Sequence, residues 1–166
     1  MSYFKTSVNS PIGALIAMAR AEDTPQETVY RLTHLHIMGG KYRPELAASV
    51  RADLPIFIQL QSELNAYFAG ESTAFNVPIA PQGTVFQQRV WKALLAIPHG
   101  QTRSYAEQAQ AIGQASAVRA VANANARNPI AIIVPCHRVI AANGALTGYA
   151  GGLTNKAALL KLETRR

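Results

Sequence analysis

The sequence predicts an α+β protein in which a small antiparallel sheet and one helix precede a mostly helical region. Strand-like apolar runs fill the first half, whereas helix-capping patterns and helically spaced apolar residues dominate the second. Between them, the segment APQG at 80–83 has the composition of a linker. The length of 166 residues suits one large or two small domains, and we place two domains at 1–80 and 84–166.

The first half is predicted to form the sheet and its helix. Strand-like runs occur at 14–19 and 29–37, and the alternation at 75–79 predicts a short edge strand. Before this last run, apolar residues keep helical spacing over a segment that Asp53 is expected to cap and Gly70 to end.

Two helices of the second half begin with capping-box patterns, in which two side chains three residues apart satisfy free backbone N–H groups. Thr84 with Gln87 opens the first helix, which ends at PHG (98–100). Ser104 with Glu107 opens a shorter helix that runs to about residue 111.

A glycine-containing turn at 112–115 leads into a third helix over 117–126, which Ser116 is expected to cap. Helix, short turn and helix is the pattern of helix-turn-helix DNA-binding proteins. The third helix is rich in Ala and Asn, so its backbone can closely approach either DNA or another helix. Arg119 places a cation in its first turn, against the helix dipole, which suggests a partner outside the fold.

Positive charge is concentrated in the second half. The net charge is +7, and residues 84–166 contain 10 basic and 2 acidic side chains, whereas residues 1–83 contain 6 and 7. This asymmetry suggests a polyanionic partner, first of all nucleic acid, although a solvated basic surface has the same composition.

Cys136 is the only cysteine, so it cannot form an internal disulfide. It follows a strand-like apolar run at 130–134 and Pro135, and His137 and Arg138 come directly after it. A lone cysteine is most often a small buried hydrophobe. Here an adjacent base and a cation can favour the thiolate, which makes a nucleophile the alternative.

The second half holds only two carboxylates that could orient His137, namely Glu107 and Glu163. Glu163 is expected to follow a last helix that Thr154 caps. The glycine-rich loop at 147–152 lies between the cysteine and this helix, and its backbone can approach a ligand closely.

Four motifs of the second half resemble the O6-alkylguanine-DNA alkyltransferase family, the methylated-DNA–protein-cysteine methyltransferases. They are GTVFQQRVWKALLAIPHGQTRSY (83–105), RAVANANARNP (119–129), PCHRVI (135–140), and GALTGYAGG with a downstream K–ALL–LE pattern (144–163). They follow the family's order and span almost the whole second half. SPIGAL (10–15) and LNAYFAGE (64–71) extend the resemblance loosely to the first half.

The resemblance implies that Cys136 accepts an alkyl group from O6 of guanine in duplex DNA. His137 would deprotonate the thiol through a water molecule, and Glu163 would orient His137. Tyr105 would donate a proton or hydrogen bond to the departing guanine, and Asn128 would hold the active-site loop together. The thioether product is not hydrolysed, so the protein would act once.

The resemblance also implies that the third helix lies in the minor groove and that Arg119 fills the gap left by a flipped-out nucleotide. The residues expected to bind DNA are Arg119, Ser116, Ala117, Ala120, Asn123 and Arg127. Those expected to line the base pocket are Tyr149, Ala150 and Val139. The first domain would be ribonuclease H-like.

No cofactor or metal is expected. The zinc site of some family members needs more cysteines than this chain has, and His34 and His36 lack an evident third ligand, so we expect them at the surface. Ala122 departs from the family's usual Gly and adds a methyl group to the expected DNA-facing helix. No apolar run approaches the ~20 residues of a membrane span. We expect the protein to be cytoplasmic and monomeric.

Three other functions are compatible with parts of the sequence. A cysteine hydrolase would use Cys136 and His137 with Asn128 or Glu163, but it leaves the basic half unexplained. A damage-binding relative that transfers nothing would not need the cysteine. A plain DNA-binding module would bury Cys136 as an inert thiol.

Overall fold

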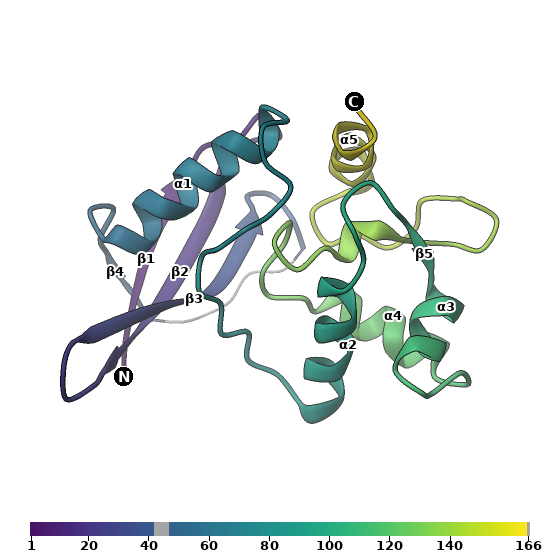
Figure 1. The fold of residues 1–166 in the computed structure, drawn as a ribbon, viewed down its shortest axis with the longest axis horizontal. Coiled ribbons are helices and arrows are strands. Elements are labelled where there is room, and N and C mark those ends of the chain that lie inside the picture. Colours follow the sequence, from purple (N-terminus) through teal and green to yellow (C-terminus); the bar gives the residue numbers. More distant parts are fainter. Residues whose placement is uncertain (42–46, 166) are drawn as a thin grey trace.

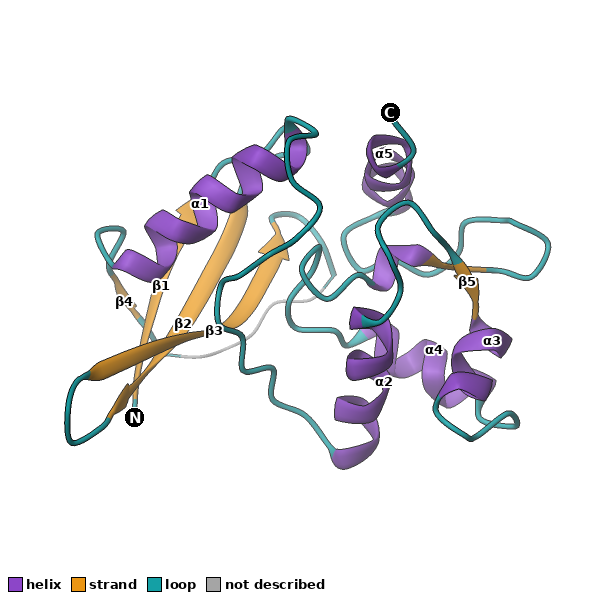
Figure 2. Cartoon of the chain, viewed as in Figure 1, coloured by secondary structure: helices purple, strands orange, loops and turns teal. Residues whose placement is uncertain are grey.

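The computed structural model describes residues 1–41 and 47–165. A sheet covered by α1 (Pro55–Phe68) forms one side of the molecule, and the remaining helices form the other (Figures 1 and 2). The mixed fold class is therefore as predicted. Within the described ranges, no helix is long and apolar enough to cross a membrane.

The sheet contains three antiparallel strands and a short parallel one. Strands β1 (Ser2–Val8), β2 (Leu15–Asp23) and β3 (Thr28–Ile37) form a meander, and β4 (Ser49–Val50) pairs with β1 in parallel, in the order β3-β2-β1-β4. The sequence did not predict β1, because its seven residues carry only two buried side chains and little apolar periodicity.

Three predictions for the first half are wrong. The N-cap of α1 is Leu54, which makes no side-chain cap, because Asp53 pairs with Arg51 instead (Nε–Oδ1 2.8 Å). Residues 75–79 form no strand, because among the described residues their pairing with β3 is an isolated bridge between Ile79 and Leu32.

The two histidines of β3 are the third correction. His34 and His36 are each only 8% exposed, so they are buried rather than at the surface. Burial lowers the pKa of each imidazole to about 4, and the charge of His34 further lowers that of His36. Both rings are therefore neutral near pH 7.

The helices of the second half begin mostly where capping patterns predict. The Thr84 capping box is complete and opens α2 (Val85–Leu95). Ser104 accepts a hydrogen bond from the Glu107 N–H (3.1 Å) at the start of α3 (Tyr105–Ala111), which is half of the predicted box.

The caps of the last two helices differ from prediction. The N-cap of α4 (Val118–Ala126) is Ala117, and the exposed Ser116 lies outside the helix. The last helix, α5 (Leu153–Glu163), begins after Gly152 rather than at Thr154, and it includes Glu163 as its final residue.

The segment before Cys136 is a buried turn and not a strand. Leu35 of β3 donates to the Pro129 carbonyl and accepts from the Ala131 N–H, both at 2.9 Å. Beyond this bridge the chain turns, with Ile132 at a φ of 72°. Cys136–Arg138 then form a single 3₁₀ turn that runs into β6 (Val139–Ile140), which pairs with β5 (Arg103–Ser104). The apolar run indicated burial, and burial does not distinguish a turn from a strand.

Polar contacts fix α4 against its neighbours. The Trp91 indole N–H of α2 donates to the Ala124 carbonyl (2.9 Å). Gln108 of α3 and Asn125 of α4 exchange two buried amide hydrogen bonds of 2.9 and 2.7 Å. The helix-turn-helix is thus a rigid part of the core, because a fully satisfied buried amide pair holds one arrangement.

Candidate active site

Asn128 holds the loop that carries Cys136. Its Nδ2 donates to the Val134 carbonyl (2.7 Å) and to the Cys136 Sγ (3.2 Å), while its Oδ1 accepts from the Ile130 N–H (3.0 Å). One buried side chain therefore ties the start of the turn to its end and aims a donor at sulfur.

The thiol of Cys136 is mostly protonated at neutral pH. Burial raises the pKa of the thiol, although the hydrogen bond from Asn128 and the charge of Lys156 act in the opposite direction. A buried thiol of this kind needs a base to become a nucleophile.

His137 is fully buried and fixed on a carboxylate. Its Nε2 lies 2.7 Å from the Glu163 Oε1. Burial alone would raise the pKa of the Glu163 carboxyl, but hydrogen bonds from His137 and Arg138 outweigh it and lower that pKa far below its usual value. The ionised carboxylate makes Nε2 the protonated nitrogen, and Nδ1 keeps its lone pair.

The free nitrogen of His137 is suited to accept a proton. Burial lowers the pKa of His137, although the hydrogen bond and charge of Glu163 act in the opposite direction. The ring is therefore neutral near pH 7. Its Nδ1 is buried and has no protein hydrogen-bond partner among the described residues.

Cys136 and His137 do not bond each other directly in the described part of the chain. They are consecutive in a 3₁₀ turn, where three residues per turn separate neighbouring side chains by about 120°. Proton transfer between the two side chains needs an intermediary such as water.

Arg138 is the counter-ion of Glu163. Its Nε donates to Oε2 and a terminal nitrogen donates to Oε1, both at 2.9 Å, and a second terminal nitrogen donates to the Ile97 carbonyl (2.7 Å). This two-point ion pair is buried, so it compensates a charge that would otherwise be costly to bury.

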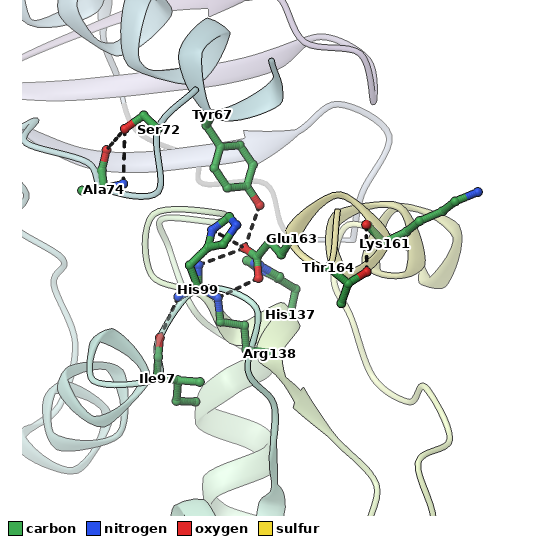
Figure 3. A network of polar contacts seen from close by, with 10 residues as sticks. All are labelled: Tyr67, Ser72, Ala74, Ile97, His99, His137, Arg138, Lys161, Glu163 and Thr164. Atoms are coloured by element: carbon green, nitrogen blue, oxygen red, sulfur yellow. Dashed lines mark hydrogen bonds and ion pairs between the residues drawn. The ribbon is translucent and has the colours of Figure 1, made fainter. Parts of the chain in front are cut away.

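Two further side chains complete the surroundings of Glu163 (Figure 3). The Tyr67 hydroxyl, from the end of α1, donates to Oε1 (2.8 Å). The Nδ1 of His99 lies 4.0 Å from the same oxygen. The carboxylate therefore lies where the first and second halves of the chain meet.

Tyr105 and Lys156 meet at the glycine-rich loop. The Tyr105 hydroxyl donates to the Thr147 carbonyl (3.1 Å). The fully buried Lys156 ammonium donates to the Thr147 and Val139 carbonyls (2.8 and 2.6 Å), 5.9 Å from the centre of the Tyr105 ring. Lys156 thus links the loop to the strand that follows the cysteine.

A small cavity of about 20 Å³ lies beside Cys136. Tyr149 and Ala150, two of the residues expected at the base pocket, are among its lining residues, whereas the buried Val139 is not. Leu35, His36 and Ile37 of β3 also line it. The N-terminal sheet therefore forms part of this cavity, which the sequence did not indicate.

The predicted DNA-binding residues lie on α4 or directly at its ends, and most of them are exposed. Its core-facing residues are Val121, Ala124 and Asn125, and Ala117 and Ala122 are half-buried. The exposed members of the predicted set are Arg119, Ser116, Ala120, Asn123 and Arg127. Between its cations the outer face of α4 carries only short side chains, so its backbone can approach a partner closely.

No group of three or more His, Cys, Asp or Glu side chains that could hold a metal ion occurs in residues 1–41 and 47–165.

Comparison with known proteins identifies the family. A family model described as "6-O-methylguanine DNA methyltransferase, DNA binding domain" matches residues 85–165. The methylated-DNA–protein-cysteine methyltransferase of Mycobacterium tuberculosis (strain H37Rv) is 49% identical over 166 residues, which cover 100% of this chain and 94% of the relative. The chain belongs to the methylated-DNA–protein-cysteine methyltransferase family.

Two further similarities extend this assignment. The methylated-DNA–protein-cysteine methyltransferase of Methanosarcina acetivorans is 50% identical over 154 residues, which cover 93% of this chain and 94% of the relative. The crystal structure of M. tuberculosis OGT in complex with DNA has a TM-score of 0.85 and 48% identity, and covers 96% of this chain and 92% of that one.

Sequence reasoning missed three residues that support the site of this methyltransferase. It read Arg138 only as positive potential, and it assigned no function to Lys156 or Tyr67. Their signal was present in the motifs PCHRVI, K–ALL–LE and LNAYFAGE. Each acts through a partner 9 to 96 residues away, so only the fold reveals its contact.

Proposed function

We propose that this chain repairs DNA by moving an alkyl group from O6 of guanine in a duplex onto the Sγ of Cys136. The observation that carries the proposal is geometric: the Sγ of the sole cysteine accepts from Asn128 at 3.2 Å, and the buried imidazole of the next residue is fixed on Glu163 at 2.7 Å. The names of the relatives and the DNA complex of the M. tuberculosis structure support it.

In the proposed reaction, a water molecule passes the thiol proton to Nδ1 of His137. The sulfur attacks the alkyl carbon, so an S–C bond forms while the C–O6 bond breaks, and the electron pair stays with guanine. Tyr105, whose hydroxyl already donates to a carbonyl at 3.1 Å, supplies the proton that restores guanine. Asn128 keeps sulfur in place through its 3.2 Å contact.

The target base must leave the duplex, because its O6 group is out of reach inside the stack. We propose that the outer face of α4 lies in the minor groove and that Arg119 occupies the gap left by the flipped nucleotide. The other contacts come from Ser116, Ala117, Ala120, Asn123 and Arg127. Tyr149 and Ala150, which line the cavity beside Cys136, form the base pocket in this proposal.

The proposed reaction ends with a stable thioether, so each molecule acts once. We place the transfer site in a C-terminal domain at 84–166 and a supporting domain at 1–80. A monomer in the cytoplasm suits this function, because a free reactive cysteine persists in a reducing compartment.

Two of the other functions receive no specific support. A cysteine hydrolase would leave unexplained the short side chains and cations on the outer face of α4. An inert buried thiol would not need a donor from Asn128 and a neutral base beside it.

A Cys136→Ser variant tests the proposal. We expect it to lose methyl transfer from an O6-methylguanine duplex, because a serine hydroxyl is a far weaker nucleophile at neutral pH, while its DNA affinity stays within about twofold. Single-turnover transfer and a binding titration on the same duplex measure the two properties. Transfer by the variant would remove Cys136 from the mechanism.

A further inference from the structure

We propose that Tyr67 is a positioning residue for the alkyl-transfer reaction, in which its hydroxyl holds the Glu163 oxygen that orients His137. The proposal deepens the proposed function and rests on it for its relevance to DNA repair. It gives the first half of the chain a direct part in the active site.

Three donors converge on one carboxylate oxygen (Figure 3). The Glu163 Oε1 lies 2.8 Å from the Tyr67 hydroxyl, 2.7 Å from the His137 Nε2 and 2.9 Å from an Arg138 guanidinium nitrogen. A carboxylate oxygen offers about two lone-pair directions, so three donors leave it little freedom to rotate. Tyr67 is the only one of the three that comes from the N-terminal half.

Tyr67 is itself held rigidly. Its side chain is 1% exposed, and its ring packs against Phe68, Phe75 and His99 with centroid distances of 5.1, 5.3 and 6.0 Å. Burial raises the pKa of the phenol, and the Glu163 charge acts in the same direction. The hydroxyl therefore stays protonated and serves as a donor to the carboxylate.

Several charged and titratable groups surround Glu163 in the described part of the chain. Glu163 faces Tyr67, His137, Arg138 and, at 4.0 Å, His99. Burial raises the pKa of Tyr149, and the charge of Glu163 acts in the same direction. The charges of Arg138 and Lys156 act on His137 against its protonation. Of these groups, Tyr67 is the neutral donor whose hydroxyl can be removed without deleting a charge.

Removal of this hydroxyl should shift the pKa of His137 in a definite direction. Tyr67 draws negative charge away from Oε1, so without it the oxygen stabilises the protonated imidazole more strongly. The pKa of His137 then rises. As the pH falls, His137 should therefore become protonated and stop accepting the Cys136 proton at a higher pH than in the wild type. The acidic limb of the pH–rate profile should move to higher pH.

The deciding experiment measures the rate of Cys136 alkylation by iodoacetamide as a function of pH, in the wild type and in Tyr67→Phe. Intact mass spectrometry measures the extent of alkylation at each time point. Cys136 is the only cysteine, so the label reports this thiol alone. An S–C bond forms, iodide leaves with the electron pair, and the thiol proton passes to His137. We expect the acidic limb to move up by about one pH unit, so that rates below it fall about tenfold.

Tyr30→Phe is the matched control, because Tyr30 lies in β3 and its ring packs edge-on against Phe4, outside the Glu163 cluster. Its profile should coincide with that of the wild type. Replacement of Tyr67 by 3-fluorotyrosine keeps the hydroxyl and makes it a stronger donor, so the limb should move to lower pH. This second variant decides the question even where Tyr67→Phe lowers the folded fraction.

The same profiles are measured for methyl transfer from O6-methylguanine as the free base and within a duplex. Equal limb shifts in all three reactions support the proposal, because they share thiol deprotonation. A limb that stays in place in both Tyr67 variants overturns it and leaves Tyr67 as a packing residue. A shifted iodoacetamide limb in a protein that transfers no methyl group overturns the proposed function but retains the positioning role.

Discussion

At the scale of single residues, Glu163 is the centre of the site. It is 4% exposed and binds His137, Arg138 and Tyr67 at once. The same contacts that orient the base also keep a buried negative charge compensated. Function and stability should therefore depend on the same side chain.

Glu163→Ala should destabilise the protein as well as inactivate it. The change leaves the buried Arg138 guanidinium without its counter-ion, which costs about 3–5 kcal/mol in comparable buried pairs. Urea denaturation followed by far-UV circular dichroism measures the free energy of unfolding. The exposed Glu71→Ala serves as the control and should change it by less than about 0.5 kcal/mol. Equal values for both variants would contradict the compensating role of Glu163.

Stability should also respond to pH through this residue. The pKa of the Glu163 carboxyl is lowered in the folded state. Its contribution is therefore present above the pKa of the unfolded chain and is lost as the pH falls towards the folded-state value.

Residue types in the local sequence singled out Cys136 and His137, and the family resemblance added Glu163 and Asn128. The fold brings the four residues together. Their detailed roles stay predictions. Arg138 could not be assigned in the same way, because a sequence does not show which carboxylate a cation meets. An arginine two residues after a cysteine suggests thiolate stabilisation, whereas here its guanidinium binds the Glu163 carboxylate.

At the scale of elements, α4 is the helix that we propose to contact DNA. Its inner face is fixed by the Trp91 and Gln108 contacts, so its outer face is presented as a rigid surface. Arg119 lies in the first turn of this face, where it is exposed.

Arg119→Ala should slow repair of duplex DNA by at least about tenfold and leave the reaction with free O6-methylguanine within about twofold. Only the duplex requires extrusion of a base, which costs of order a few kcal/mol. Single-turnover rates on the two substrates measure the difference. Arg127→Ala, on the same exposed face, is the matched control and should mainly weaken binding. Equal losses on both substrates would refute the finger role of Arg119.

Element types were more predictable than their ends. The Thr84 box was read correctly, because Thr84 and Gln87 satisfy each other's backbone N–H groups locally. Ser116 failed as a cap, since the chain has already entered a turn conformation at Ala117 (φ −90°, ψ 30°) and the serine side chain lies outside the first turn. Strand β1 was missed because its pairing with β2 depends on tertiary contacts.

At the scale of the whole molecule, the two halves share one apolar core and one site. The buried cluster runs from Val8 in β1 to Leu159 in α5. The linker composition at 80–83 predicted the change of architecture. It gave no indication that β3 and α1 would supply part of the cavity wall and a donor to Glu163. Such contacts join residues far apart in sequence and follow no local pattern.

The charge of the second half should appear as a salt dependence of DNA binding. Two of its cations, Arg138 and Lys156, are buried, so the surface potential comes from the others. Even two phosphate contacts give about a tenfold loss of affinity between 50 and 200 mM salt. Fluorescence anisotropy with an unmodified duplex measures the slope.

Two variants test which part of the surface carries the positive charge that binds DNA. Arg127→Gln should reduce the salt slope by about one, whereas Arg51→Gln, next to Asp53 in the N-terminal half, should leave it unchanged. A flat salt response in the wild type, or equal slopes in all three proteins, would contradict α4 as the DNA-binding face.

The central claim is that Cys136 takes the alkyl group itself, and intact mass spectrometry tests it most directly. The protein is incubated with an equal amount of a duplex that carries one O6-methylguanine, and both are weighed. The account predicts a gain of one methyl group per protein, located on the Cys136 peptide, and an equal amount of lesion converted to guanine. Tight binding with neither mass changed would contradict it and would leave a damage-binding protein.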